Sequence, residues 1–178
     1  MSNTNDLFRL NVGFISHLTV GYSRDFDFYS PSVYLPPDLD LFELSGTAKL
    51  TRTTQGLLMQ VKMQATTTLE CVRCLEDYAQ TVDIDFTELY AYSPDDVTDE
   101  GFLFPDDGKI DLEPLVREEM LLSMPFKPIC RADCSGLCPV CGENKNEVDC
   151  EHDEDAVDPR LAGLKQFLQE EQDSGVPE

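Results

Sequence analysis

Hydrophobic and polar residues alternate in two segments of the first half of the chain. Residues 57–65 place hydrophobic side chains at every second position from 59 to 63, with glutamine or lysine between them. Residues 82–87 repeat the alternation, with aspartate and threonine as the polar partners. A period of two with one polar face is typical of antiparallel strands that are buried on one side. The first half of the chain is therefore predicted to be β-rich.

Further strands are predicted around these two. Residues 44–52 form a partner strand, joined to the next one through a turn at 53–56, and residues 8–14 form an edge strand. Proline interrupts regular structure because it lacks an amide hydrogen. Three prolines therefore predict a loop between the opening strand and the central strands: Pro31, Pro36 and Pro37.

A helix is predicted after an aspartate-rich loop at residues 93–111. Asp111 is a suitable N-cap, Pro114 suits the first helical turn, and Pro125 follows the expected end near Ser123. Hydrophobic side chains then recur at helical spacing and form a face that would cover a sheet: Leu112, Leu115, Val116 and Met120.

The rest of the chain is rich in cysteine. Residues 130–152 hold five of the seven cysteines, and a second helix is predicted from Asp158 onward, with a hydrophobic stripe. These elements predict the α+β class, with an antiparallel sheet core, one covering helix and a Cys-rich, zinc-binding C-terminal extension. The predicted domains are residues 1–125 and residues 126–178.

The chain is strongly acidic. Its 178 residues include 35 Asp and Glu against 13 Lys and Arg, so the formal net charge is −22. Binding to phosphate requires clustered cations, so this balance argues against nucleic acid as the primary ligand and favours basic partners.

The sequence also predicts a location in the cell. The first residues carry no basic segment followed by an apolar one, and no apolar run approaches the roughly 20 residues of a membrane span. We therefore expect a cytoplasmic protein with no membrane partner. Thiols stay reduced in that compartment, so the cysteines are interpreted as metal ligands and not as disulfides.

The cysteines fall into closely spaced pairs. Two residues between thiolates let both sulfurs reach one ion, and a glycine after the second thiol permits the tight turn. The last pair combines a thiolate with an imidazole. Together the pairs offer eight ligands: Cys71 and Cys74, Cys130 and Cys134, Cys138 and Cys141, and Cys150 and His152.

Eight ligands suffice for two tetrahedral zinc ions. One partition places Cys71, Cys74, Cys130 and Cys134 around the first ion and the other four ligands around the second. A single site that uses Cys138, Cys141, Cys150 and one of the two cysteines at 130 and 134 also fits the spacing. Iron suits such thiolate sites too. A redox role or simple burial of the thiols are further interpretations.

No constellation of catalytic residues is present. The sequence contains neither a nucleophile-elbow motif nor a glycine-rich phosphate loop. A zinc ion with four protein ligands has no open position for a substrate. The sequence thus predicts a protein that is not an enzyme and has no small-molecule substrate.

Several motifs, in this order and spacing, resemble the YceD family, also called large ribosomal RNA subunit accumulation proteins. They lie at residues 69–75 (LECVRCL), 110–112 (IDL), 116–125 (VREEMLLSMP), 134–146 (CSGLCPVCGENKN) and 158–160 (DPR). The resemblance covers about residues 11–168, although the part up to about residue 41 matches poorly. Its transferable residues are Cys71, Cys74, the C-terminal cysteine set and Glu118.

The resemblance implies a non-enzymatic bacterial protein needed for the accumulation or processing of 23S ribosomal RNA precursor. The net charge is hard to reconcile with direct RNA binding, so we expect an acidic adaptor for a basic ribosomal protein or a basic RNA-processing factor. Two alternatives remain: a thiol redox protein, and a zinc-knuckle RNA binder that uses the cations Arg73, Lys127, Arg131 and Lys145.

Overall fold

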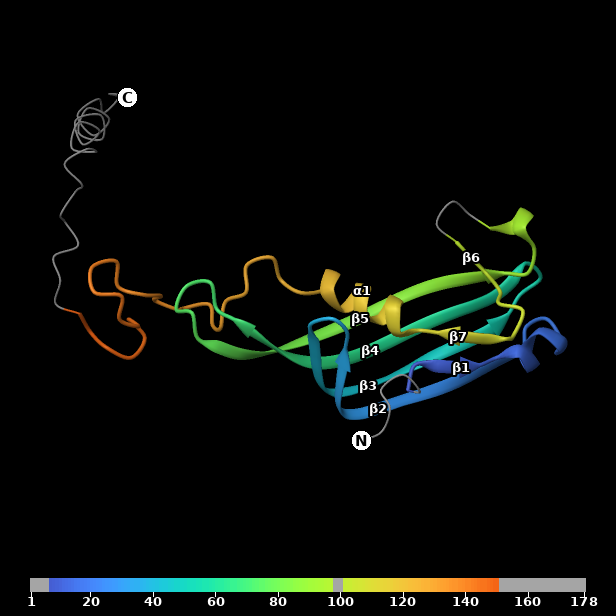
Figure 1. The fold of residues 1–178 in the computed structure, drawn as a ribbon, viewed down its shortest axis with the longest axis horizontal. Coiled ribbons are helices and arrows are strands. Elements are labelled where there is room, and N and C mark those ends of the chain that lie inside the picture. The colour runs from blue at the N-terminus through green and yellow to red at the C-terminus, as the bar shows by residue number, and fades with distance from the viewer. Residues whose placement is uncertain (1–6, 98–100, 151–178) are drawn as a thin grey trace, which may run out of the picture. The chain divides into compact units, whose positions relative to one another are not determined.

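The computed structural model describes residues 7–97 and 101–150, and Figure 1 shows the fold. The chain divides into two compact units, residues 1–134 and residues 135–178. The sheet and the helix belong to the first unit. The predicted domain boundary after residue 125 stays a prediction, and the helix predicted from Asp158 lies outside the described residues.

The first unit is built on one long, mostly antiparallel sheet. Its strands lie in the order β2-β3-β4-β5-β6, and only the short β5–β6 pairing is parallel. Short connections join β2, β3, β4 and β5 in that order. Strands that are neighbours in sequence are therefore also neighbours in the sheet. The strands are β2 (Ser23–Leu35), β3 (Leu39–Arg52), β4 (Gly56–Glu70), β5 (Asp77–Ala91) and β6 (Phe102–Leu103).

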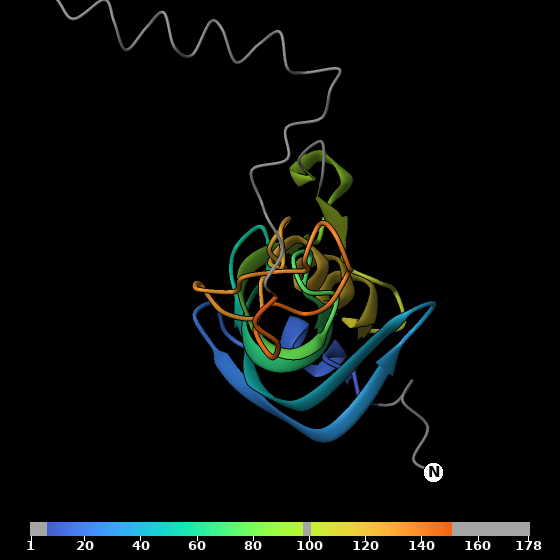
Figure 2. The ribbon, with the colours of Figure 1, turned by 90° about the vertical axis from the view of Figure 1, so that its left-hand side faces the viewer.

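A second layer covers one face of this sheet. The strands β1 (Arg9–Asn11) and β7 (Lys109–Asp111) form a two-stranded antiparallel sheet, and the helix α1 (Glu113–Leu122) follows β7. Two short 3-10 helices, η2 (Gly13–His17) and η3 (Pro94–Asp96), lie in the connections. In Figure 2 the strands of the long sheet curve around, and α1 lies on the concave side.

The alternation in the sequence decides which side of the sheet is buried. In β4, Met59, Val61 and Met63 are buried, while the polar residues between them are exposed. Leu112, Val116 and Met120 of the helical segment join the same core. The helix therefore packs through the face that its sequence period predicts. The α+β class, the antiparallel sheet core and the single covering helix are confirmed for the described residues.

The loop predicted around the prolines is wrong at Pro31, whereas Pro36 and Pro37 lie in the turn between β2 and β3. Residues 23–35 form the edge strand β2, and Pro31 lies within it. A proline is tolerated at a sheet edge, where its missing amide hydrogen deprives no neighbour of a bond. The register passes from Ser30 to Ser32 on β2 without using Pro31 or the facing Glu43, whose φ is +52°.

The predicted edge strand at residues 8–14 also needs correction. Only Arg9–Asn11 is extended, and it pairs with β7 instead of joining the long sheet. The predicted N-cap, Asp111, is one residue too early, because Leu112 is the N-cap of α1. The Asp111 carboxylate accepts a hydrogen bond from the amide of Glu113, the first residue of α1, at 3.0 Å.

A glycine at position 108 lets the turn before β7 lie against η2. Gly108 has a φ of +65°, and a methyl group there would come within 2.5 Å of the Gly13 Cα. We expect Gly108→Ala to lower the free energy of unfolding by about 3 kcal/mol, because it combines a backbone clash with a left-handed backbone. Urea denaturation measures this change.

Gly21 provides a matched control for this substitution. Its φ is +91°, but nothing lies within 4 Å of the position of the added methyl group. Gly21→Ala should therefore cost only the backbone term, about 1 kcal/mol. Equal losses from the two substitutions would contradict the close approach of Gly108 to Gly13.

Candidate metal centre

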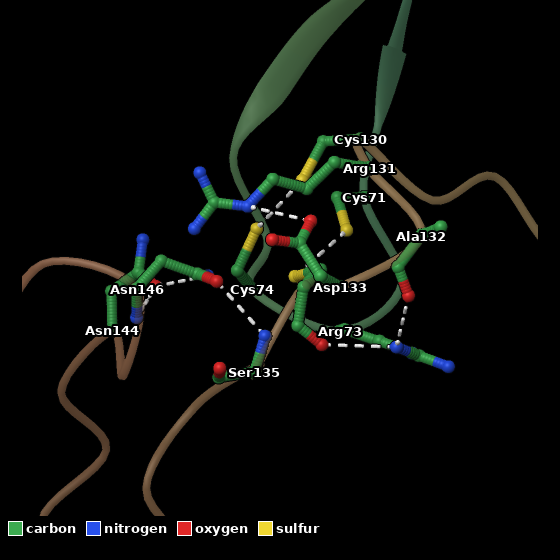
Figure 3. Close-up of polar contacts among 11 residues, drawn as sticks. Cys71, Arg73, Cys74, Cys130, Arg131, Ala132, Asp133, Ser135, Asn144 and Asn146 are labelled. Atoms are coloured by element: carbon green, nitrogen blue, oxygen red, sulfur yellow. Dashed lines mark hydrogen bonds and ion pairs between the residues drawn. The ribbon is translucent and has the colours of Figure 1, made fainter.

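The first cysteine cluster joins two parts of the first unit. Cys71 and Cys74 lie in the turn between β4 and β5, and Cys130 and Cys134 lie in the segment after α1. Figure 3 shows Cys71, Cys74 and Cys130 near one another. The four sulfur atoms lie within 4.8 Å of one another. The structure therefore brings together the four cysteines of the first predicted group.

These sulfurs are close but not bonded. The Sγ atoms of Cys71 and Cys134 are 3.9 Å apart, and those of Cys74 and Cys130 are 3.7 Å apart. A disulfide bond measures about 2.05 Å, so all four thiols are free. Three of the four residues are buried and Cys130 is half-buried. A shielded set of four soft donors could hold a metal ion.

Backbone hydrogen bonds shape this cluster. The amide of Leu75 donates to the carbonyl of Cys71 at 2.9 Å, and Leu75 has a φ of +59°, so the chain turns back tightly here. The amide of Val72 donates to the carbonyl of Pro128 at 2.9 Å. That bond fixes the turn against the segment that carries the other two thiols.

Arg73 also links the two segments, although its role could not be read from the cysteine spacing. Its guanidinium donates to the backbone carbonyl of Cys134 at 2.9 Å, and the carbonyl of Ala132 lies at 3.5 Å (Figure 3). Arg131 forms an ion pair with Asp133 at 3.4 Å. Two of the cations near the cluster are thus occupied within the protein.

The second cluster lies in the second unit. The sulfurs of Cys138, Cys141 and Cys150 lie within 4.8 Å of one another, and those of Cys141 and Cys150 are 3.6 Å apart. Cys138 is buried and Cys141 is exposed. His152, the predicted fourth ligand, lies outside the described residues.

The loop around Cys138 has the form of a metal knuckle. The amide of Gly142 donates to the carbonyl of Cys138 at 2.9 Å, and the amide of Cys138 donates to the carbonyl of Glu143 at 2.8 Å. Gly142 has a φ of +78°, which only glycine adopts without strain. The predicted need for a glycine after the second thiol is met.

Two asparagines that the sequence interpretation missed stabilise this unit. The Asn146 side chain accepts a hydrogen bond from the amide of Ser135 at 2.8 Å, and Asn144 accepts one from the amide of Asn146 at 3.0 Å (Figure 3). Asparagine often bonds to nearby backbone in this way, so an Asn-x-Asn after the knuckle was the available signal.

The thiols of each cluster differ in acidity. Backbone amides, that of Cys130 first, lower the pKa of Cys71 to about 6, and the amide of Cys141 is the main cause that lowers the pKa of Cys138 to about 7. Burial, followed by the adjacent thiols, raises the pKa of Cys130 to about 12. The neighbouring Cys141 and then burial raise the pKa of Cys150 to about 11. The lowered pKa favours the thiolates of Cys71 and Cys138, and ionisation of Cys130 and Cys150 requires a cation to offset the repulsion.

The positions of the thiols agree with two separate ligand sets better than with a single set. Cys130 and Cys134 lie with the pair at 71 and 74, as the two-site partition expects, whereas the one-site alternative would place one of them beside Cys138. The described residues therefore contain two separate clusters that could each hold an ion. The ligand assignment itself stays a prediction.

The described helices are unsuited to a bilayer. None of the helices formed by the described residues has the length and the apolar character that crossing a membrane requires.

The chain is similar to proteins from several bacteria. The chain is 37% identical over 143 residues to an uncharacterized protein of Mycobacterium tuberculosis, a match that covers 77% of this chain and 64% of that protein. It is 32% identical over 108 residues to the uncharacterized protein YlbN of Bacillus subtilis, covering 60% of this chain and 63% of YlbN. The chain thus spans less than two thirds of the length of these relatives.

A third relative has a functional name. The large ribosomal RNA subunit accumulation protein YceD of Haemophilus influenzae is 37% identical over 82 residues, 41% of this chain and 45% of that protein. No solved structure matches the chain. The family model of large ribosomal RNA subunit accumulation protein YceD matches residues 59–168, which include both cysteine clusters and more than half of the chain. The chain therefore belongs to the YceD family.

Proposed function

We propose that this protein is a non-enzymatic ribosome-biogenesis factor of the cytoplasm that supports the accumulation or processing of 23S ribosomal RNA precursor. The observation that carries the proposal is the family match across the part of the chain that holds β4, β5, α1 and both cysteine clusters. The name of the Haemophilus relative supports the same role.

The charge of the protein favours a basic protein partner over RNA. The net charge is −22, and a zinc ion bound by four thiolates, or by three and an imidazole, leaves its site negative. A large RNA interface would therefore oppose Coulomb repulsion, whereas a basic ribosomal protein or a basic RNA-processing factor would be attracted. We infer that the protein acts as an acidic adaptor.

Zinc is the proposed metal. The sulfurs of a tetrahedral site with Zn–S bonds of about 2.3 Å lie about 3.8 Å apart. Two of the separations in the first cluster are 3.7 Å and 3.9 Å, and all four sulfurs lie within 4.8 Å of one another, which supports a tetrahedral zinc site. In the second site Cys138, Cys141 and Cys150 would supply three thiolates and His152 the fourth ligand. Iron remains the other metal that such donors accept.

The metals have a structural role in this proposal. Four protein ligands complete the coordination of zinc and leave no position for a substrate. The first ion would join the β4–β5 turn to the segment after α1, and the second would fold the knuckle of the second unit. At the first cluster, burial of Cys71 argues against a thiol redox role despite its lowered pKa, because exchange requires access to the thiolate.

A second candidate function is direct RNA binding near the first cluster. Arg73, Lys127 and Arg131 follow or precede its ligands closely in sequence and are exposed. However, Arg73 bonds to the backbone of Cys134 and Arg131 is paired with Asp133. These internal bonds hold both side chains against the protein, and the net charge of −22 opposes a large phosphate interface, so the adaptor function is preferred.

An affinity pull-down from a bacterial lysate separates the two candidates. With the full chain as bait, we expect ribosomal proteins to be recovered equally with and without nuclease, because the proposed contact is between proteins. The mixture is analysed by mass spectrometry and by RNA quantification. Recovery that disappears after nuclease treatment would contradict the adaptor function and support RNA binding.

A further inference from the structure

One side of β5 has almost no strand partner. On one side β5 pairs with β4 along its whole length, from Asp77 to Ala91. On the other side it pairs only with β6, at Tyr90 and Ala91. Among the described strands, none pairs with β5 on that side between Asp77 and Thr87. The helix α1 contacts β5, and both contribute to the same hydrophobic core. Backbone groups of a strand that lack a strand partner on one side can receive another chain as an added strand.

The acidic residues of β5 favour a partner strand with basic side chains. The sequence of β5 contains four acidic residues and no basic one. Asp83 and Asp85 are exposed on the sheet face opposite the core, and the Asp85 side chain is 63% exposed. Opposite charges on directly facing residues of neighbouring strands stabilise the pairing, and like charges destabilise it.

The two aspartates retain the capacity to bind a further cation. Asp83 accepts a hydrogen bond from Gln64 of β4 at 2.6 Å, and Asp85 is paired with Lys62 of β4 at 2.8 Å. Both contacts come from the side of β4. A carboxylate offers about four acceptor positions, so lysine or arginine on a strand added to the other side can bind to the same groups.

The opposite edge of the sheet is less suitable. It is formed by β2, where Pro31 interrupts the ladder and the acidic Asp25 and Asp27 are accompanied by Arg24. Proline in an edge strand hinders the addition of another strand. The two edges thus differ in both backbone continuity and charge.

We propose that the open edge of β5 is the docking site for an extended basic segment of a protein partner, which adds to the sheet as a further strand. This inference rests on the proposed adaptor function and identifies the surface that would perform it. Backbone hydrogen bonds supply the affinity, and alternate basic side chains beside Asp83 and Asp85 supply the selectivity.

The test uses the full chain and a synthetic peptide of ten alternating lysine and valine residues. Hydrogen–deuterium exchange followed by mass spectrometry should show that the peptide protects the amides of residues 77–89, since a new ladder covers them. A peptide of equal charge, in which proline replaces two central valines, should bind at least tenfold more weakly. Protection confined to other segments, or equal binding of the two peptides, would overturn the proposal.

Charge variants provide a second measurement. The double substitution Asp83→Asn and Asp85→Asn should weaken peptide binding at least tenfold. The control Asp25→Asn and Asp27→Asn makes the same change of net charge on β2, and it should weaken binding less than twofold, since charges beyond the Debye length of about 8 Å are screened. Equal losses would show general attraction to an acidic protein and overturn the docking site.

The lysate pull-down distinguishes failure of this inference from failure of the proposed function. If the β5 variant recovers ribosomal proteins as well as the unaltered chain does, the docking site is wrong and the adaptor function stands. If the unaltered chain binds the peptide along β5 but recovers neither a ribosomal protein nor an RNA-processing factor, the docking site stands and the proposed function is wrong.

Discussion

Replacing Cys71 and Cys74 together with serine should remove one equivalent of zinc and lower the free energy of unfolding by about 4 kcal/mol. That figure corresponds to free metal at a thousandfold excess over its dissociation constant, because a ligand bound only to the folded state stabilises it by mass action. The loss should be large because the thiolates of this mostly buried cluster would repel one another without the ion. Metal analysis and urea denaturation measure the two effects.

Val72→Ser is a matched control for this double substitution. Val72 lies in the same turn between the two thiols and is exposed, and its amide, which bonds to Pro128, is unchanged by the substitution. The control should keep its full metal content and lose less than about 0.5 kcal/mol of stability. A double variant that retains its zinc would show that the first ligand set is wrong.

Replacing Cys138 and Cys141 with serine should also remove one equivalent of zinc, but it should leave the urea midpoint of the sheet unchanged. These thiols belong to the second unit, and among the described residues neither core cluster of the first unit contains a residue beyond Cys134. Exchange of the amides in residues 136–150 should become faster, because the knuckle loses the ion that stabilises it.

The metal content of the unaltered protein is the reference value for both double substitutions. Protein purified without chelator should contain between one and two equivalents of zinc. If neither double substitution lowers that content, the whole ligand assignment is wrong. Visible absorption from bound iron would contradict zinc as the metal, while the grouping of the sulfurs would still hold.

The local periods in the sequence were enough to predict the central strands and α1. The alternation in β4 and in the middle of β5 gave both the strands and their buried faces, since a period of two assigns each side chain to one face. The hydrophobic spacing of Val116 and Met120 gave the buried face of the helix in the same way. Ligand chemistry and the count of pairs offered the grouping of Cys71, Cys74, Cys130 and Cys134 as one of two partitions, and spacing alone did not decide between them.

The errors arose where a local rule depends on tertiary context. Pro31 indicates a break in most settings, but it is compatible with a strand that has a neighbour on only one side. The short strand β1 pairs with β7, about a hundred residues later, and no local pattern specifies such a partner. Arg73 was noticed as a cation, yet its bond to Cys134 depends on the approach of two distant segments.

The first cysteine cluster also has a topological consequence. Cys71 and Cys134 are 63 positions apart, and the chain between them contains β5, β6, β7 and α1. A bound ion would close this stretch into a ring. By the loop-entropy relation used for cross-links, such a ring removes roughly 4 kcal/mol of conformational freedom from the unfolded chain. The ion would thus favour the docking of α1 onto the sheet even though α1 supplies none of its ligands.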